Sequence, residues 1–190
     1  MSIVLASASP RRRELLGMLG VKDLKIIPAE GEELFFKEMR PDEVVCSLSR
    51  AKAREVSEKC AASDVVIAAD TVVELRGEIL GKPTDREDAF RMLSELSGRE
   101  HSVYTGVTVI KGETVITEYA RTTVHFRVLT EREIWAYIDT GEPMDKAGAY
   151  GAQGIASLFV EGIEGDFFNV VGLPVCRLSK MLEKLGVNLI

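Results

Sequence analysis

The chain has 190 residues, of which 46% are hydrophobic and 28% are charged. This composition supports a buried core in one domain spanning residues 1–190 and excludes disorder as the dominant state. The net charge of −6 excludes broad nucleic-acid binding driven by counterion release, so no stable nucleic-acid partner is expected. A local basic pocket or a metal ion can still attract a polyanion to an acidic protein.

The predicted elements of the first half alternate between strands and helices. Ser9 and Pro10 mark the start of a helix, because a proline at the first helical position loses no useful donor, and Gly20 marks its end. The continuous apolar run at residues 64–69 predicts a strand buried on both faces that ends at Asp70. The other elements predicted before it are strands at residues 3–6 and 25–28 and a helix at residues 41–58.

The second half continues the alternation. The Arg76-Gly77 turn predicts a hairpin, Thr84 is expected to cap a helix, and Thr130 begins another helix with a capping-box pattern. The predicted strands are at residues 72–75, 78–80, 102–111, 115–128 and 157–160, and two of the helices are at residues 84–96 and 174–185. This order favours an α/β fold with a mixed sheet.

Cysteine use and hydropathy indicate a cytoplasmic protein. The three cysteines are widely spaced and form no Cys-x-x-Cys pair, which is typical of reduced thiols in a cytosolic protein. The amino terminus places its apolar residues before its charged ones, the reverse of a signal peptide. No apolar run approaches the ~20 residues that a membrane span requires, so no membrane association is expected.

The first candidate site is the segment at residues 7–13, which carries Arg11, Arg12 and Arg13 in the first turn of the predicted helix. Free backbone N–H groups at a helix start attract anions, and guanidinium groups bind phosphate bidentately. A basic first turn opposes the helix dipole, and a bound anion would explain it. The alternative is a solvated basic turn.

Three other segments carry candidate chemistry. A carboxylate at Asp70 could hold a metal or activate water, although most aspartates at strand ends are turn or cap residues. Lys82, between a glycine and a proline, suits phosphate oxygens, and a surface lysine is the alternative. The glycine-rich stretch at residues 141–154 permits close backbone approach to a ligand but lacks the P-loop pattern. His101 and His125 lie in or beside predicted strands and are interpreted as structural.

Six short segments, taken in order, resemble the Maf family of nucleotide pyrophosphatases. They are LASASPRR, AADTVV, GKP, LSGREHSVYTGV, GEPMDKAGAYGAQG and NVVGLP, spread over residues 3–186 without a large gap. The resemblance implies a fold like that of the inosine-triphosphate pyrophosphatases, a mixed twisted sheet with flanking helices and two lobes around a cleft. It also implies that the protein hydrolyses nucleoside triphosphates to the monophosphate and pyrophosphate with Mg²⁺ or Mn²⁺. Removal of unwanted nucleotides and a link to septum formation and division arrest are associated with the family.

The resemblance also implies roles for individual residues. Asp70 and Glu33 would bind the metal, and Asp70 would accept the proton of the attacking water. The loop departs from the commoner Asp-Glu pair, having Glu32-Glu33 instead. The other implied residues are the catalytic lysines Lys52 and Lys82 and the substrate-binding residues Ser7, Ser9, Arg11 and Arg12. For Lys52, which lies in a predicted helix, a merely solvated lysine is the alternative.

The substrate preference is inferred from three positions. Arg12 (or its neighbour Arg11), Thr71 and Gln153 match family members that hydrolyse dTTP and UTP, and modified pyrimidine nucleotides are further candidate substrates. A glutamine amide can pair with a pyrimidine carbonyl and N3–H together, which makes this preference chemically reasonable. A 7-methyl-GTP pyrophosphatase and a non-catalytic nucleotide-binding regulator of division are the alternatives. Family members can form homodimers, although no exposed apolar stripe in this sequence demands one.

Overall fold

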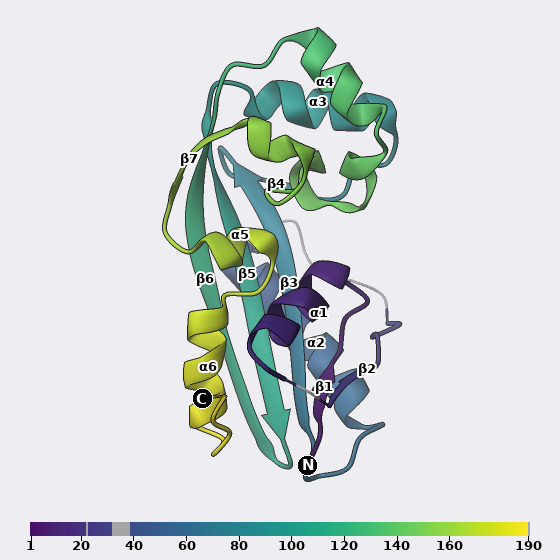
Figure 1. Ribbon diagram of the computed structural model, residues 1–190, viewed down its shortest axis with the longest axis vertical. Coiled ribbons are helices and arrows are strands. Elements are labelled where there is room, and N and C mark those ends of the chain that lie inside the picture. The colour runs from purple at the N-terminus through teal and green to yellow at the C-terminus, as the bar shows by residue number, and fades with distance from the viewer. Residues whose placement is uncertain (22, 32–38, 190) are drawn as a thin grey trace. The chain divides into compact units, whose positions relative to one another are not determined.

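The computed structural model describes residues 1–21, 23–31 and 39–189 (Figure 1). The chain forms two compact units, which correspond to the two lobes that the family resemblance implies. Unit 1 is made of three segments, Met1–Asp70, Thr105–Ala120 and Gly172–Ile190. Unit 2 is made of two segments, Thr71–Tyr104 and Arg121–Val171. Each unit is therefore assembled from parts of the sequence that lie far apart.

The strands form a mixed sheet in the order β2-β1-β3-β5-β6-β7, with β4 paired to β3. They are β1 (Ile3–Leu5), β2 (Leu24–Ile26), β3 (Val65–Leu75), β4 (Glu78–Leu80), β5 (Glu100–Lys111), β6 (Thr114–Phe126) and β7 (Val160–Glu164). β2 and β3 run parallel to β1, whereas β4 and β7 run antiparallel to β3 and β6. The predicted α/β fold with a mixed sheet is confirmed.

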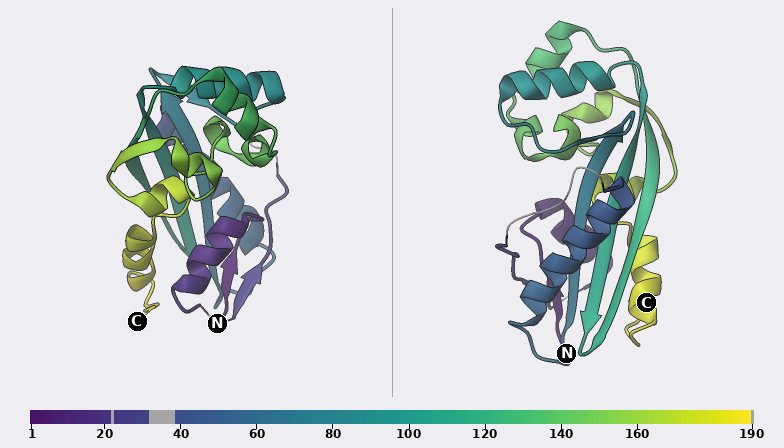
Figure 2. Two further views of the ribbon diagram at one scale, coloured as in Figure 1. Left: turned by 45° about the horizontal axis from the view of Figure 1, so that its top comes forward. Right: turned by 180° about the vertical axis from the view of Figure 1, so that it is seen from behind.

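The helices are α1 (Pro10–Met18), α2 (Pro41–Ser57), α3 (Arg86–Leu96), α4 (Glu131–Ile138), α5 (Phe167–Val171) and α6 (Val175–Glu183). Within unit 1, opposite views show α1 and α6 on one face of the sheet and α2 on the other (Figures 1 and 2). Within unit 2, α3 and α4 pack together, with the rings of Phe90 and Trp135 stacked 4.7 Å apart. None of the helices in the described residues has the length and apolar character of a membrane span.

The α2 helix lies against β5 at unusually close range. A Cβ atom at Gly106 of β5 would clash with the Val45 carbonyl oxygen of α2, so this position accepts only glycine without a shift of the backbone. One helical turn further along, Ser49 Oγ and Thr108 Oγ1 form a buried hydrogen bond of 3.0 Å. This close approach fixes α2 over the sheet of unit 1.

The predicted end of the strand at Asp70 is wrong, because β3 continues past this residue. The strand continues through Asp70 to Leu75, and its last residues pair with β4 from Val73 onward. Before Asp70, β3 pairs with β1, and this pairing extends only to Ile67. Asp70 ends the apolar run of the sequence but not the strand. A buried charge is tolerated at this position because Lys52 forms an ion pair with it.

Two other local predictions are wrong for identifiable reasons. The cap of α3 is Asp85, whose carboxylate accepts the Asp88 N–H at 2.7 Å, while Thr84 donates its own N–H to Asp88 at 3.0 Å. The last strand is β7 rather than residues 157–160, because a short 3-10 turn (η3, Ile155–Leu158) occupies the first half of that segment. By contrast, the capping box of Thr130 and Glu133 on α4 is confirmed.

Replacement of Gly106 by alanine tests the close approach of α2. We expect Gly106→Ala to lower the free energy of unfolding by about 1–3 kcal/mol, because the added methyl group overpacks the helix–sheet contact. Urea titration followed by circular dichroism measures the change. Gly17→Ala is the matched control, since nothing lies within 4 Å of a Cβ there, and it should leave stability unchanged or slightly higher. Equal stability of the two variants would contradict the argument.

Candidate active site

The first candidate segment folds as the turn after β1 and the first turn of α1. Ser9 is the N-cap, its Oγ accepting the Arg12 N–H at 3.5 Å, and Pro10 takes the first helical position. Ser7 Oγ accepts the Ser9 N–H at 3.2 Å. Both predicted serines therefore shape the backbone of the helix start, where unpaired N–H groups favour an anion. Arg11 lies half-buried in the same turn.

The Arg12 guanidinium is anchored within unit 1. Its Nε donates to the Gly172 carbonyl at 2.8 Å and its Nη1 donates to Ser7 Oγ at 3.2 Å. Gly172 belongs to the NVVGLP segment, so this contact joins two predicted motifs that lie 160 residues apart in the sequence. The positive charge of Arg12 is thereby held at the start of α1.

A buried ion pair joins α2 to β3. Lys52 Nζ lies 2.5 Å from Asp70 Oδ1, and the two side chains are only 18% and 9% exposed. Alternate residues of a strand face the same side, and Val66 and Ala68 of β3 pack against Ala53 of α2. Asp70 is the next residue in that alternation, so it faces the same helix. The structure therefore brings together two residues that the sequence analysis assigned to catalysis.

Burial makes this pair more consequential than a surface ion pair. Taking each charge out of water costs several kcal/mol, and mutual attraction offsets that cost only when both partners are present. Lys52 thus balances Asp70 and orients its carboxylate through Oδ1. The fixed Asp70 carboxylate and the anion-binding start of α1 both belong to unit 1.

The donor set at Asp70 fits a divalent cation that arrives with its substrate. Carboxylate oxygens are hard donors of the kind that Mg²⁺ and Mn²⁺ prefer. Mg²⁺ is commonly bound by one or two carboxylates together with substrate phosphates, rather than by an all-protein cage. Residues 1–21, 23–31 and 39–189 contain no group of three or more His, Cys, Asp or Glu side chains placed to hold a metal. Glu33, the second predicted ligand, lies outside the described residues.

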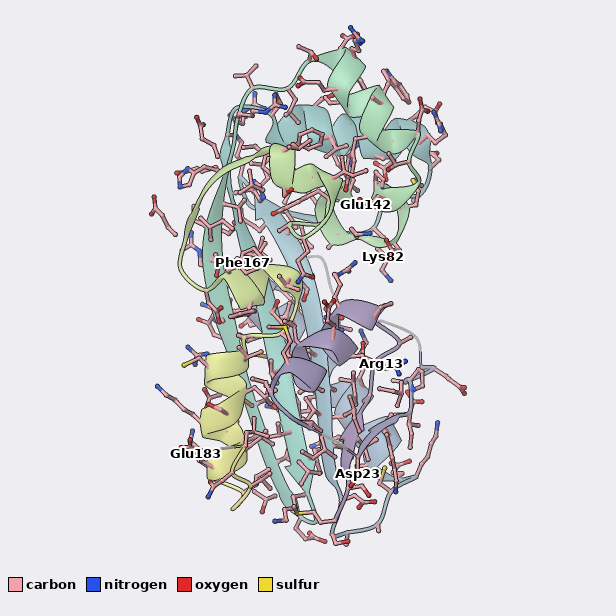
Figure 3. The ribbon with its side chains drawn as sticks, viewed as in Figure 1. Arg13, Asp23, Lys82, Glu142, Phe167 and Glu183 are labelled. Carbon is pink, nitrogen blue, oxygen red and sulfur yellow. The ribbon has the colours of Figure 1, made fainter. Side chains whose placement is uncertain are left out.

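The remaining predicted residues belong to unit 2. Lys82 is exposed just after β4 (Figure 3), Thr71 is half-buried in β3, and Gln153 is exposed in the glycine-rich stretch. The GKP motif and that stretch are neighbours, because the Gly148 N–H donates to the Gly81 carbonyl at 2.9 Å. The predicted site residues thus form two groups, one in each unit.

The two histidines lie on neighbouring strands, His101 on β5 and His125 on β6. His101 is 3% exposed, and its Nε2 lies 2.7 Å from the Tyr150 hydroxyl. Burial, helped by the nearby His125, lowers the pKa of His101 to about 4, so its ring is neutral near pH 7. His125 Nε2 lies 3.0 Å from Glu164 Oε1 on the more exposed side of β6.

The sequence analysis missed two residues that are hydrogen-bonded to each other: Glu142, within the glycine-rich stretch, and Tyr137, on the helix α4 before it. Glu142 is the charged residue of the Gly-Glu-Pro motif, and its place between a glycine and a proline was the available signal. For Tyr137 the sequence indicated only an aromatic residue on a helix.

The chain is similar to known proteins over nearly its whole length. The family model described as "Maf-like protein" matches residues 2–185. A "dTTP/UTP pyrophosphatase" from a Thermoanaerobacter species is 48% identical over 186 residues, covering 97% of this chain and 96% of that protein. A "dTTP/UTP pyrophosphatase" from Agathobacter rectalis is 50% identical over 205 residues, covering 98% of each.

A solved structure shares the fold. The HAM1 protein from Coxiella burnetii aligns with a TM-score of 0.51 and 15% sequence identity, covering 97% of this chain and 99% of that one. At this identity the likeness concerns the fold alone, and it agrees with the mixed sheet and flanking helices described above.

The buried histidine predicts a pH dependence of stability. The pKa of His101 is about 4 in the folded state and about 6.5 when unfolded, so only the unfolded chain takes up this proton between those values. The contribution of His101 to the free energy of unfolding is therefore complete above pH ~6.5, and it falls by about 3 kcal/mol as the pH drops to ~4. Urea unfolding at several pH values should show a shallower loss over this window for His101→Gln than for the wild type. Parallel curves would contradict the assignment.

Proposed function

The chain belongs to the Maf-like protein family, and from this membership and the geometry of unit 1 we propose that it hydrolyses dTTP and UTP to the monophosphate and pyrophosphate. Relatives named for this activity are 48% and 50% identical to it over nearly their whole length. The observation that carries the proposal is the buried Lys52–Asp70 pair, in the same unit as the anchored Arg12.

Asp70 acts as the proton acceptor in this proposal. Lys52 binds its Oδ1, so the side chain is held in one orientation and Oδ2 is assigned to the water that attacks the α-phosphorus. A bound divalent metal, held by Asp70 and Glu33, would lower the pKa of that water and neutralise phosphate charge. Positioning of this kind supplies most of the catalysis in phosphoryl transfer.

Cationic residues stabilise the phosphates in this proposal. Arg12 is held at the start of α1 by Gly172 and Ser7, where helix N–H groups add to its charge. Arg11 and Lys82 are assigned to the same task. A guanidinium in a fixed position strengthens its interaction as charge grows on the departing pyrophosphate, and fixed donors cost no reorganisation during the reaction.

We also propose that the protein works in the cytoplasm. Its three cysteines, Cys46, Cys60 and Cys176, are all free, as expected of thiols kept reduced in that compartment.

Pyrophosphate release from a panel of nucleotides tests the proposed function. The panel contains dTTP, UTP, CTP, dITP and 7-methyl-GTP, each with Mg²⁺ or Mn²⁺ and again with a chelator. We expect metal-dependent release that favours dTTP and UTP. Release that favours 7-methyl-GTP would overturn the substrate preference, and no release from a folded sample would overturn the activity itself.

Asp70→Asn isolates the proton acceptor. The amide matches the shape of the carboxylate but cannot take the proton of water, so we expect kcat with UTP to fall by about 10²–10⁴-fold. Steady-state pyrophosphate release measures the loss, and circular dichroism verifies the fold. Asp139→Asn is the control, because it removes only an exposed pair with Arg86 and should keep full activity. Near-normal turnover by Asp70→Asn would refute the role.

A further inference from the structure

One carboxylate, that of Glu142, binds the loop that carries Gln153. Glu142 begins the 3-10 turn η1 (Glu142–Asp145) in unit 2 (Figure 3). Its Oε1 accepts the Tyr137 hydroxyl at 3.0 Å, and its Oε2 accepts the Ile155 N–H at 3.1 Å. The Tyr137 oxygen in turn accepts the Gly151 N–H at 3.3 Å. Backbone N–H groups two residues before and two residues after Gln153 are therefore held by one connected group.

The glycines of this loop leave the space that the carboxylate occupies. A Cβ atom at Gly154 would clash with the Glu142 carboxylate, and one at Gly151 would lie 2.7 Å from Lys146 Cε. Real Cβ atoms do not approach other atoms so closely without a shift of the neighbour. The loop backbone therefore passes close to Glu142 and Lys146 at these two glycines, where the sequence analysis expected a close approach to a ligand.

Lys146 fastens the same turn from the other side. Its Nζ donates to the Glu142 carbonyl oxygen at 2.6 Å and also lies 2.6 Å from Asp145 Oδ1. The Lys146 side chain is only 12% exposed. The main chain and the side chain of Glu142 are therefore both held, which makes its carboxylate a fixed point rather than a solvated charge.

The Tyr137 link is chemically stable near neutral pH. Tyr137 is 2% exposed, and burial together with the Glu142 carboxylate raises the pKa of its phenol well above the usual range. The phenol therefore stays protonated and donates to Glu142 while accepting from Gly151. Its ring packs against Phe159, with the centroids 5.2 Å apart, so the hydroxyl is aimed by the core of unit 2.

We propose that Glu142 is a positioning residue for base recognition, acting through Tyr137 and Ile155 to hold Gln153 where it reads the pyrimidine edge. This inference rests on the proposed function and on the assignment of Gln153 to the base. The Gln153 side chain is exposed, so its direction is set by the backbone that carries it. A glutamine amide distinguishes uracil from cytosine only if its oxygen and nitrogen are held in a fixed order, because the two bases present opposite donors and acceptors.

The test is the preference for UTP over CTP, expressed as the ratio of the two kcat/KM values. Glu142→Gln exchanges one acceptor oxygen for a donor, and Tyr137→Phe removes only the hydroxyl that joins Glu142 to Gly151. We expect each variant to lower the preference about tenfold, the effect of one lost hydrogen bond, with little change in kcat for UTP. Glu133→Gln is the matched control, since this carboxylate also caps backbone but on α4, and it should keep the wild-type ratio.

A double-variant comparison separates positioning from general loosening of the fold. If Glu142 acts through Gln153, Glu142→Gln should have no further effect on the UTP-to-CTP ratio in a Gln153→Ala background. An unchanged ratio in both Glu142→Gln and Tyr137→Phe, in an active and selective enzyme, would overturn this inference alone. An equal effect with and without Gln153 would also overturn it. Failure of the wild type to release pyrophosphate would instead overturn the proposed function, and the inference with it.

Amide hydrogen exchange provides a readout that is independent of activity. We expect the peptide spanning residues 151–155 to exchange about tenfold faster in Glu142→Gln and Tyr137→Phe than in the wild type, and Glu133→Gln to match the wild type. Unchanged protection of this peptide in both variants would show that the loop does not depend on Glu142 and would reject the inference.

Discussion

The buried contact between Lys52 and Asp70 is the constraint on which unit 1 depends. The Asp70 side chain is only 9% exposed within a strand, and a cation in direct contact offsets the free energy of removing its charge from water. The cation comes from α2, which can reach the strand only by packing closely on the sheet. Gly106 permits close packing of α2 on the sheet, and Lys52 of the same helix lies 2.5 Å from Asp70. The same helix, α2, therefore both packs closely on the sheet and supplies the cation of the candidate site.

Backbone carbonyl groups join motifs that are distant in the sequence. In unit 1, Arg12 donates to the Gly172 carbonyl, and in unit 2 the Gly148 N–H donates to the Gly81 carbonyl. Gly148 and Gly172 have positive φ angles of 66° and 115°, a backbone conformation that favours glycine at these two positions. The proposed substrate-binding residues need support from neighbours that do not touch the substrate, and these contacts fit that role.

In unit 2 a carboxylate, that of Glu142, holds a loop through hydrogen bonds. In unit 1 a lysine neutralises the buried acid, whereas the Glu142 carboxylate accepts a phenol and a backbone N–H. Hydrogen bonds to an ionised acceptor are stronger than those between neutral groups. One charged residue can therefore fix a glycine-rich segment that has little side-chain packing of its own.

The sequence by itself determined features that depend on neighbours within a turn or two. The N-cap of α1 at Ser9 and the capping box of Thr130 and Glu133 were predictable, because both depend on side-chain contacts three residues apart. The mixed α/β class followed from the alternation of apolar patterns. The family resemblance named Asp70, Lys52 and Arg12 without any account of the contacts that each of them makes.

Only the tertiary structure decided what depends on distant contacts. Asp70 was expected at the end of a strand, yet β3 continues, because Lys52, 18 residues earlier, balances the charge and β4 supplies the next pairing. The anchoring of Arg12 depends on a carbonyl 160 residues away. Glu142 gave no periodic signal, since its partners belong to a helix before it and a loop after it. Local sequence specifies local hydrogen bonds, but the partner of a buried charge is known only once the chain has folded.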